Sequence, residues 1–172
     1  VQFAPPERAA ALLEPVEGTV EWLAHGDVAM RLAALRADQS AGRAPGDAGQ
    51  FSLAGAQPKT ALLFDGERWG VPAGRTPTTH ILKPPLGNFD GHAENEHLCL
   101  ELARAFGLPA ANSQVRRFGD EVAIVVERYD RRRTADGIRR LHQEDLCQSI
   151  GLPPTMKYQN DCLLYTSDAA DE

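Results

Sequence analysis

Apolar residues in the first part of the chain recur at helical spacing. A short apolar run occupies residues 9–13, and Val20, Leu23, Ala24, Ala29, Leu32 and Leu35 then loosely follow the i, i+3, i+4 rule. Residues 38–49 are polar and rich in glycine, which is typical of a linker. The pattern therefore predicts a helix over residues 9–37 and assigns residues 1–50 to an N-terminal helical segment with its linker.

After the linker the pattern becomes that of strands. Residues 60–64 (TALLF) and residues 68–72 (RWGVP) flank Asp65 and Gly66, a pair that favours a hairpin turn because glycine accepts a positive φ. Residues 76–83 are rich in β-branched side chains and predict a third strand. Two prolines directly after Lys83 would end it.

The clearest helix covers residues 92–106. Its apolar stripe includes Leu98, Leu102 and Phe106, and Gly107 follows in the position expected at a helix C-terminus. We expect this stripe to be buried.

A second hairpin pattern joins residues 114–118 to residues 122–126. The latter are apolar throughout, which favours a strand inside the sheet. A loop is then expected as far as Arg140, and residues 143–150 predict a short helix. The order of elements predicts an α+β fold with an antiparallel sheet.

Composition places the chain among ordinary globular proteins. Of 172 residues, 42% are hydrophobic and 24% charged, which excludes a disordered or fibrous chain. No run of about 18 apolar residues predicts a membrane span, and no secretory leader is visible. The net charge of −6 argues against a protein that coats nucleic acid. Cys99 and Cys147 fall in apolar helical patterns, which favours buried, reduced thiols and a cytoplasmic location.

Basic charge is concentrated in one region. Residues 115–140 contain eight arginines: Arg116, Arg117, Arg128, Arg131, Arg132, Arg133, Arg139 and Arg140. A solvated basic face is the ordinary interpretation of such a run. The alternative is a patch that binds phosphate or an acidic partner.

Several residues have the types and the order that phosphoryl transfer from a nucleotide requires. A loop of small residues ends at Lys59, Lys83 ends a strand, and Glu96 lies near the start of a helix. Such a loop lets backbone N–H groups approach phosphate, and a helix carboxylate can hold a strand lysine in place. Each part has an ordinary alternative: a tight turn, a surface lysine and compensation of the helix dipole. The spacing of Lys83 and Glu96 makes an ion pair between them feasible.

These residues also lie in blocks that resemble the HipA family, the serine/threonine kinases that act as toxins in bacterial toxin–antitoxin pairs. The resemblance spans roughly residues 20–161. The blocks are residues 51–62 (FSLAGAQPKTAL), 77–83 (PTTHILK), 94–96 (ENE), 126–131 (VERYDR), 141–148 (LHQEDLCQ) and 157–158 (KY). The resemblance implies a kinase-like N-lobe at residues 51–133, built from an antiparallel sheet and one helix, and the start of a helical C-lobe at residues 134–161.

The resemblance also implies residue roles. Lys83 would bind ATP with Glu96 as its helix partner, and Ser52 would be the site of autophosphorylation that silences the kinase. The phosphate loop would comprise Ala54, Gly55, Ala56, Gln57, Pro58 and Lys59, and the hinge that holds adenine would comprise Glu127, Arg128 and Tyr129. ATP and Mg²⁺ are the implied cofactors. The implied partners are a DNA-binding antitoxin of the HipB type, DNA through that antitoxin, and an aminoacyl-tRNA synthetase as protein substrate.

One part of the family pattern is missing. The catalytic aspartate and the metal ligands are expected beyond the point where this sequence stops, so no catalytic or metal residue is assigned and we expect this chain to be inactive by itself. Residues 90–95 (DGHAEN) look like the catalytic block but lie at the start of the Glu96 helix, so we interpret them as a loop that runs into that helix. Residues 162–172 match nothing before them and are interpreted as a sequencing-adapter artefact.

Two expectations follow from this interpretation. The strand at residues 122–126 and the helix at residues 143–150 should expose apolar surface, because the lobe against which they would pack is missing.

A rival function is a non-enzymatic kinase-like module that binds an antitoxin, or an antitoxin–DNA complex, through residues 116–140.

Overall fold

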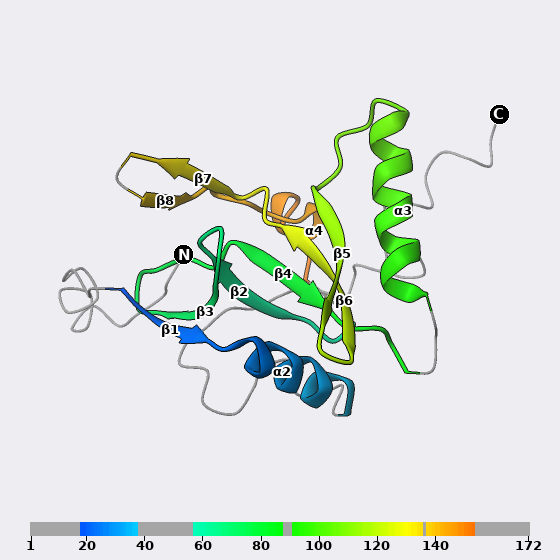
Figure 1. The fold of residues 1–172 in the computed structure, drawn as a ribbon. Coiled ribbons are helices and arrows are strands. Elements are labelled where there is room, and N and C mark those ends of the chain that lie inside the picture. The colour runs from blue at the N-terminus through cyan, green and yellow to red at the C-terminus, as the bar shows by residue number, and fades with distance from the viewer. Residues whose placement is uncertain (1–17, 38–56, 88–90, 136, 154–172) are drawn as a thin grey trace. The chain divides into compact units, whose positions relative to one another are not determined.

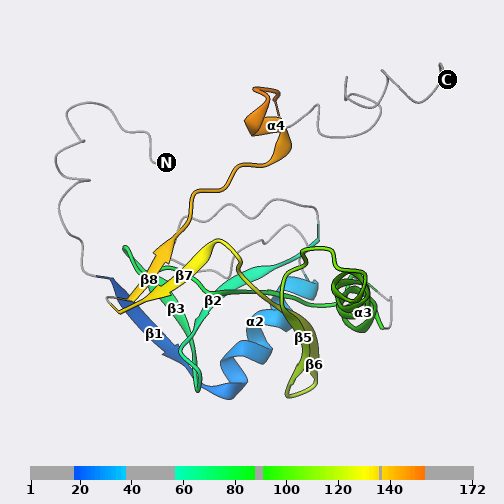
Figure 2. The same ribbon diagram turned by 90° about the horizontal axis from the view of Figure 1, so that it is seen from above.

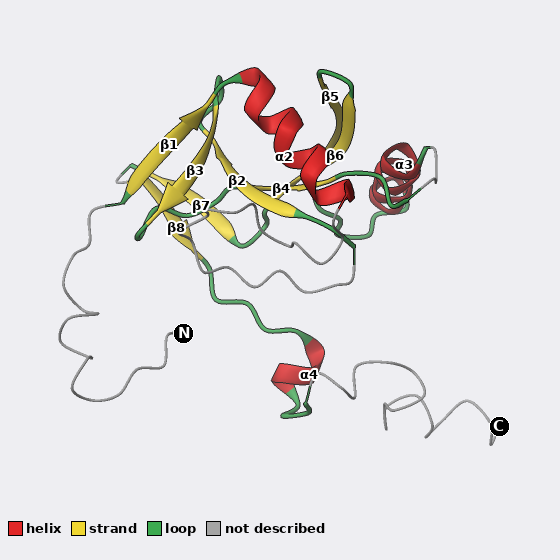
Figure 3. Cartoon of the chain, turned by 90° about the horizontal axis from the view of Figure 1, so that it is seen from below, coloured by secondary structure: helices red, strands yellow, loops and turns green. Residues whose placement is uncertain are grey.

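The computed structural model describes residues 18–37, 57–87, 91–135 and 137–153. These residues form eight strands and three helices (Figures 1 and 3). In chain order they are β1 (Thr19–Leu23), α2 (His25–Ala37), β2 (Thr60–Phe64), β3 (Trp69–Ala73), β4 (His80–Lys83), α3 (His92–Ala105), β5 (Ser113–Phe118), β6 (Glu121–Glu127), β7 (Arg131–Thr134), β8 (Gly137–Arg140) and α4 (Leu146–Ser149).

Six strands form one antiparallel sheet in the order β1-β3-β2-β4-β6-β5, and β7 pairs with β8 separately. The predicted α+β class with an antiparallel sheet is confirmed. The described residues up to Arg139 form one compact unit, and the described residues from Arg140 to Pro153 form another. No helix in the described ranges is long and apolar enough to cross a membrane.

The predicted turn at Asp65 and Gly66 is confirmed and has a clear local cause. Asp65 Oδ1 accepts hydrogen bonds from the backbone N–H groups of Glu67, at 2.9 Å, and Arg68, at 2.8 Å. Gly66 has a φ of 119°, which a residue with a Cβ rarely adopts. The chemistry of this turn favours the return of β3 beside β2.

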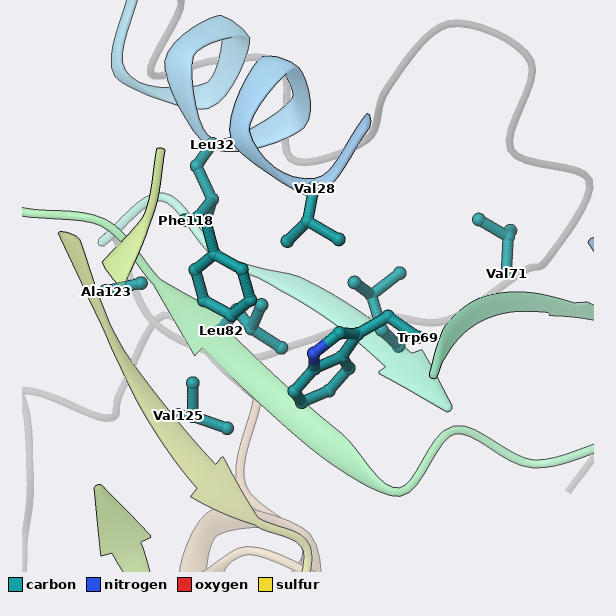
Figure 4. Close-up of a cluster of buried hydrophobic side chains, with 9 residues drawn as sticks. Val28, Leu32, Trp69, Val71, Leu82, Phe118, Ala123 and Val125 are labelled. Atoms are coloured by element: carbon teal, nitrogen blue, oxygen red, sulfur yellow. The ribbon is translucent and has the colours of Figure 1, made fainter. Parts of the chain in front are cut away.

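The hydrophobic core lies between α2 and one face of the sheet. Val28 and Leu32 of α2 are buried against the rings of Trp69 and Phe118, with Leu82 below them (Figure 4). Successive side chains of a strand point to opposite faces, so Leu82 lies on the α2 face and Lys83 on the other.

The N-terminal prediction of one helix over residues 9–37 is wrong in its middle part. Residues 19–23 form β1, which pairs with β3 from Thr19 opposite Ala73 to Leu23 opposite Trp69. The alternation of side chains in TVEWL and this tertiary pairing outweigh the loose helical spacing. Helix α2 begins only at His25, where Asp27 Oδ2 accepts a hydrogen bond from the Ala24 N–H at 2.8 Å. Residues 9–17 and the linker lie outside the described residues.

Close packing at β1 requires a glycine in the neighbouring strand. A Cβ on Gly70 would lie 2.4 Å from Val20 Cγ1 and 3.0 Å from the ring of Trp22. Both distances are shorter than normal contacts, so β1 can lie against β3 only because residue 70 has no side chain.

Two predicted segments differ from the structure in the middle and at the end of the sheet. The strand predicted over residues 76–83 forms only from His80 to Lys83. The loop predicted as far as Arg140 contains the β7–β8 hairpin, whose second strand begins at Gly137 with a φ of 124°. Its arginine-rich strands lack an apolar alternation, so the pattern gave no signal for them.

Helix α3 has the predicted limits but not the predicted burial. Leu98 is 56% exposed and Phe106 is 80% exposed, so the apolar stripe is not buried within the described chain. Cys99 is exposed, which contradicts the predicted buried thiol, whereas Cys147 is buried as predicted. Helix α3 contacts β5 and β6 (Figure 2), but these contacts do not cover the stripe.

The predicted second hairpin is confirmed, with β5 pairing with β6 and β6 lying inside the sheet. The expectation that β6 exposes apolar surface is wrong for the middle of the strand, where Ala123, Ile124 and Val125 are buried, but Val122 and Val126 are only half-buried. Contacts with β4, β5, α2 and α3 cover the middle of this strand.

Candidate functional site

Lys83 and Glu96 form an ion pair at the end of β4. The Lys83 Nζ donates to Glu96 Oε1, and about a quarter of each side chain is exposed, 21% for Lys83 and 26% for Glu96. Two prolines end β4 directly after Lys83, and Gly91, with φ 72°, precedes the first residue of α3. The chain thereby reverses, and the second turn of α3 brings a carboxylate to the strand lysine.

An apolar floor extends from Lys83 along the same face of the sheet. Ile81 lies opposite Val126 of β6 and opposite Ala61 of β2, and paired residues in an antiparallel sheet share a face. Ile81 and Val126 are half-buried, so they leave some apolar surface accessible. This floor lies on the face opposite to α2.

The described end of the predicted phosphate loop lies at the Lys83 end of the sheet. Thr60 pairs with Leu82, so the residue before Thr60 and the residue after Leu82, Lys59 and Lys83, lie at the same end of the strand pair. Gln57 Nε2 donates to the carbonyl oxygen of Pro84 at 3.4 Å and lies 3.4 Å from His92 Nδ1, at the start of α3. Pro58 and Lys59 are buried. Ser52, Ala54, Gly55 and Ala56 lie outside the described residues.

The predicted hinge follows β6 at the opposite end of β4. The backbone N–H of Arg128 donates to the carbonyl of Thr79 at 2.9 Å, which joins the hinge to the segment before β4. Glu127 pairs with His80, on the α2 face, and its carboxylate accepts a hydrogen bond from Asn112 Nδ2 at 3.1 Å. Tyr129 is 71% exposed.

The side chain of Arg128 is largely buried in a cluster of polar side chains. The sequence analysis did not predict this cluster. Asp130 receives hydrogen bonds from Arg128 and Arg131, and both arginines also contact Thr78. Burial raises the pKa of the Asp130 carboxyl, but the hydrogen bonds and charges of the two arginines outweigh burial, and the net pKa is lowered. In the sequence, the only indication of this cluster was that Asp130 lies between Arg128 and Arg131 shortly after an apolar strand.

His80 is half-buried on the α2 face. Its ring lies edge-on to Trp69, with centroids 5.4 Å apart, and its Nδ1 lies 2.8 Å from Thr79 Oγ1. Burial lowers the pKa of His80 below its ordinary value, and Arg133 and Arg116 lower this pKa further, against a raising effect of Glu127.

The eight arginines of residues 115–140 do not form a uniform solvated face. Arg128 and Arg131 form ion pairs with Asp130. The guanidinium of Arg116 lies 5.4 Å from the centroid of the Phe64 ring. The exposed members are Arg117, Arg132, Arg133, Arg139 and Arg140. In the described ranges no three His, Cys, Asp or Glu side chains gather as metal ligands.

Comparisons with known proteins show which family the chain is similar to. Residues 51–171 match the family model described as the HipA-like C-terminal domain. A protein named putative kinase Y4mE from Sinorhizobium fredii is 49% identical over 114 residues, which are 65% of this chain and 27% of that protein. The serine/threonine-protein kinase toxin HipA of Shewanella oneidensis is 33% identical over 114 residues, which are 65% of this chain and 26% of that protein.

A solved structure has a similar fold. It is the Shewanella oneidensis complex of the toxin HipA, HipB and operator DNA, with a TM-score of 0.68, 27% identity, and coverage of 89% of this chain and 35% of that one. The chain thus spans about a quarter to a third of the length of these relatives.

Proposed function

The chain belongs to the HipA-like C-terminal domain family, and on this premise we propose that residues 51–133 are the ATP-binding part of a serine/threonine protein kinase of a toxin–antitoxin pair. The observation that carries the proposal is the Lys83–Glu96 ion pair. Protein kinases require such a strand lysine and helix glutamate to hold the nucleotide phosphates.

ATP would lie along the Lys83 face of the sheet. Lys83 and the loop of residues 54–59 would hold the phosphates, and the backbone of residues 127–129 would hold the adenine edge. Ile81 and Val126 would lie beneath the base as the apolar floor. His80 and Lys83, which mark the two ends of β4, are separated by about 10 Å of strand, so one elongated ligand can reach both ends.

ATP would supply the phosphoryl group that a kinase transfers, and Mg²⁺ would neutralise charge on it. The described residues fit the nucleotide better than the metal, because a cation–carboxylate pair and an apolar floor are present and no cluster of metal ligands is. We therefore assign nucleotide binding to this chain and no catalytic or metal residue, and we propose that the chain does not transfer phosphate by itself.

Ser52 is the proposed regulatory site. A phosphate there would add about −1.5 to −2 charges at the root of the loop that is proposed to hold the ATP phosphates. Repulsion between the two phosphate groups would weaken ATP binding, which is the direction expected of a silencing modification.

The similar solved structure contains HipB and operator DNA, which supports an antitoxin of the HipB type, and DNA through that antitoxin, as partners. An aminoacyl-tRNA synthetase as substrate is implied only by the family resemblance. These partners would place the whole protein in the bacterial cytoplasm. A second candidate function is a non-enzymatic module that binds the antitoxin or its DNA complex. The five exposed arginines between residues 117 and 140 favour it, because exposed guanidinium groups attract phosphate and acidic surfaces.

Calorimetric titration of the chain with ATP tests the main proposal. Lys83→Ala should weaken ATP binding by about tenfold or more, because a charge-assisted contact to phosphate is lost. Arg132→Ala removes an exposed cation from the same unit and is the matched control. Equal ATP affinity of the wild type and Lys83→Ala would refute the assigned role of Lys83.

A further inference from the structure

The segment that leaves β6 is fixed by a buried charge cluster made of Thr78, Arg128, Asp130 and Arg131. The Arg128 guanidinium donates two parallel hydrogen bonds to the Asp130 carboxylate, from Nε to Oδ1 at 3.0 Å and from Nη2 to Oδ2 at 2.8 Å. Arg131 Nη1 adds a third, to Oδ2 at 2.7 Å. Charge-assisted, bidentate bonds of this kind specify geometry as well as contributing energy.

The cluster ties two separate segments together. Arg128 Nη1 donates to Thr78 Oγ1 at 3.3 Å, and Arg131 Nε donates to the Thr78 carbonyl at 2.7 Å. Thr78 lies just before β4, and Asp130 lies just after β6. The three charged side chains are between 10% and 13% exposed, so water competes little for these bonds.

Between these fixed positions the chain presents one residue outward. Tyr129 is 71% exposed, whereas Arg128 before it and Asp130 and Arg131 after it are engaged in the cluster. The backbone at Arg128 is also held, through its N–H to the Thr79 carbonyl. The path of residues 127–129 is therefore determined from both sides by contacts that do not involve a ligand.

We propose that Asp130 is a positioning residue that sets the backbone of residues 127–129 for recognition of the nucleotide base. This inference rests on the proposed function and deepens it, because it separates base recognition, fixed by the Asp130 cluster, from phosphate binding at the Lys83 end of β4. Asp130 contacts its arginines rather than the nucleotide. Loss of its charge should loosen the hinge and leave the phosphate end intact.

The separation gives a readout that general destabilisation would not produce. The probes are ATP and inorganic tripolyphosphate, each titrated into the full 172-residue chain. Asp130→Asn keeps the shape but places an amide against the Arg128 guanidinium, and we expect it to weaken ATP binding by about tenfold. Tripolyphosphate, which lacks a base, should bind the variant and the wild type equally. Arg132→Gln, at an exposed neighbour, is the control that should change neither affinity.

A second variant keeps the test decisive if Asp130→Asn does not fold, as judged by circular dichroism. Arg128→Lys retains the positive charge and loses the planar fork, so it should shift the ATP-to-tripolyphosphate ratio in the same direction. Asp130→Glu, which restores the carboxylate, should recover part of the ATP affinity.

The outcomes distinguish this inference from the function on which it rests. An unchanged ATP-to-tripolyphosphate ratio in folded Asp130→Asn, or in Arg128→Lys, would overturn the positioning role while the ATP site stands. Equal weakening of both ligands would also overturn it, because the cluster would then be merely structural. A wild-type chain that binds tripolyphosphate but no ATP would overturn the proposed function and this inference together.

Discussion

At the scale of single residues, the ammonium of Lys83 is oriented by the carboxylate of Glu96. About a quarter of each side chain is exposed, so the pair is screened less than a surface pair. Glu96→Gln should leave Lys83 less well oriented and weaken ATP binding by about three- to tenfold, measured by calorimetry.

Glu94 provides the control for that prediction. It lies on the same helix two residues earlier and is exposed, so Glu94→Gln changes the helix charge by the same amount without removing the lysine partner. ATP affinities that fall equally in Glu94→Gln and Glu96→Gln would show a general effect of helix charge and contradict a specific pair.

His80 makes the stability of the fold depend on pH. Because its pKa in the folded chain is below the ordinary 6.5, the unfolded chain binds protons more readily. The free energy of unfolding should therefore be highest above pH 6.5 and fall as the pH decreases below it. Urea denaturation between about pH 7.5 and about pH 5 measures this slope, which His80→Gln should reduce.

A comparison with Asp130 makes the pH result specific. The pKa of Asp130 is lowered from 3.8, so its own contribution is lost only at more acidic pH, outside the histidine window. A slope unchanged in His80→Gln would mean that another group carries the dependence.

Single residues differ in how well their roles could be predicted. The Lys83–Glu96 pair could be predicted from the sequence, because the end of the strand, the two prolines that follow it and the start of the helix are all local signals. The role of Asp130 was not, since Thr78 lies 52 positions before it in the chain and only the register of β4 and β6 brings them together. Exposure of Cys99 was missed because a helical stripe gives no information about whether anything covers it.

At the scale of elements, α2 and α3 have apolar positions at similar spacing but opposite burial. Leu32 of α2 is fully buried in the core, whereas Leu102 of α3 is 47% exposed. Leu32→Ala should lower the free energy of unfolding by about 2–5 kcal/mol because it creates a cavity. Leu102→Gln should change the free energy of unfolding by no more than about 0.5 kcal/mol.

Denaturant titration of both variants compares the two helices directly. A cost for Leu102→Gln as large as that for Leu32→Ala would mean that the outer face of α3 is covered in solution. The expected difference would show that the apolar stripe contributes little to the stability of this chain.

Elements with strong local signals were predicted correctly. The β2–β3 and β5–β6 hairpins and the limits of α3 follow from turn residues and terminal glycines. Strand β1 and the β7–β8 hairpin were missed, because both depend on pairing rather than on an apolar period. At β1 the decisive feature is the missing side chain of Gly70, on another strand.

At the scale of the whole molecule, every described residue of the candidate site belongs to the unit that ends at Arg139. Nothing in the strand order β1-β3-β2-β4-β6-β5 could be read from the chain except the hairpin neighbours. The contact of β4 with β6 is not a hairpin, yet it brings Ile81 to Val126 and the hinge to the end of β4. The family resemblance assigned Lys83 and the hinge to one ATP site but predicted no pairing between these two strands, and local patterns did not predict it either.

This division predicts that the nucleotide site does not require the C-terminal unit. A chain ending at Leu141 retains all eight described strands, the Lys83–Glu96 pair and the Asp130 cluster. It should unfold cooperatively and bind ATP with a Kd within about twofold of that of the full chain. A chain ending at Asp120 lacks all of β6 and the hinge, and it should bind no ATP. Loss of ATP binding in the chain ending at Leu141, with binding retained in the full chain, would place part of the site in residues 142–172 and contradict the assignment to the sheet.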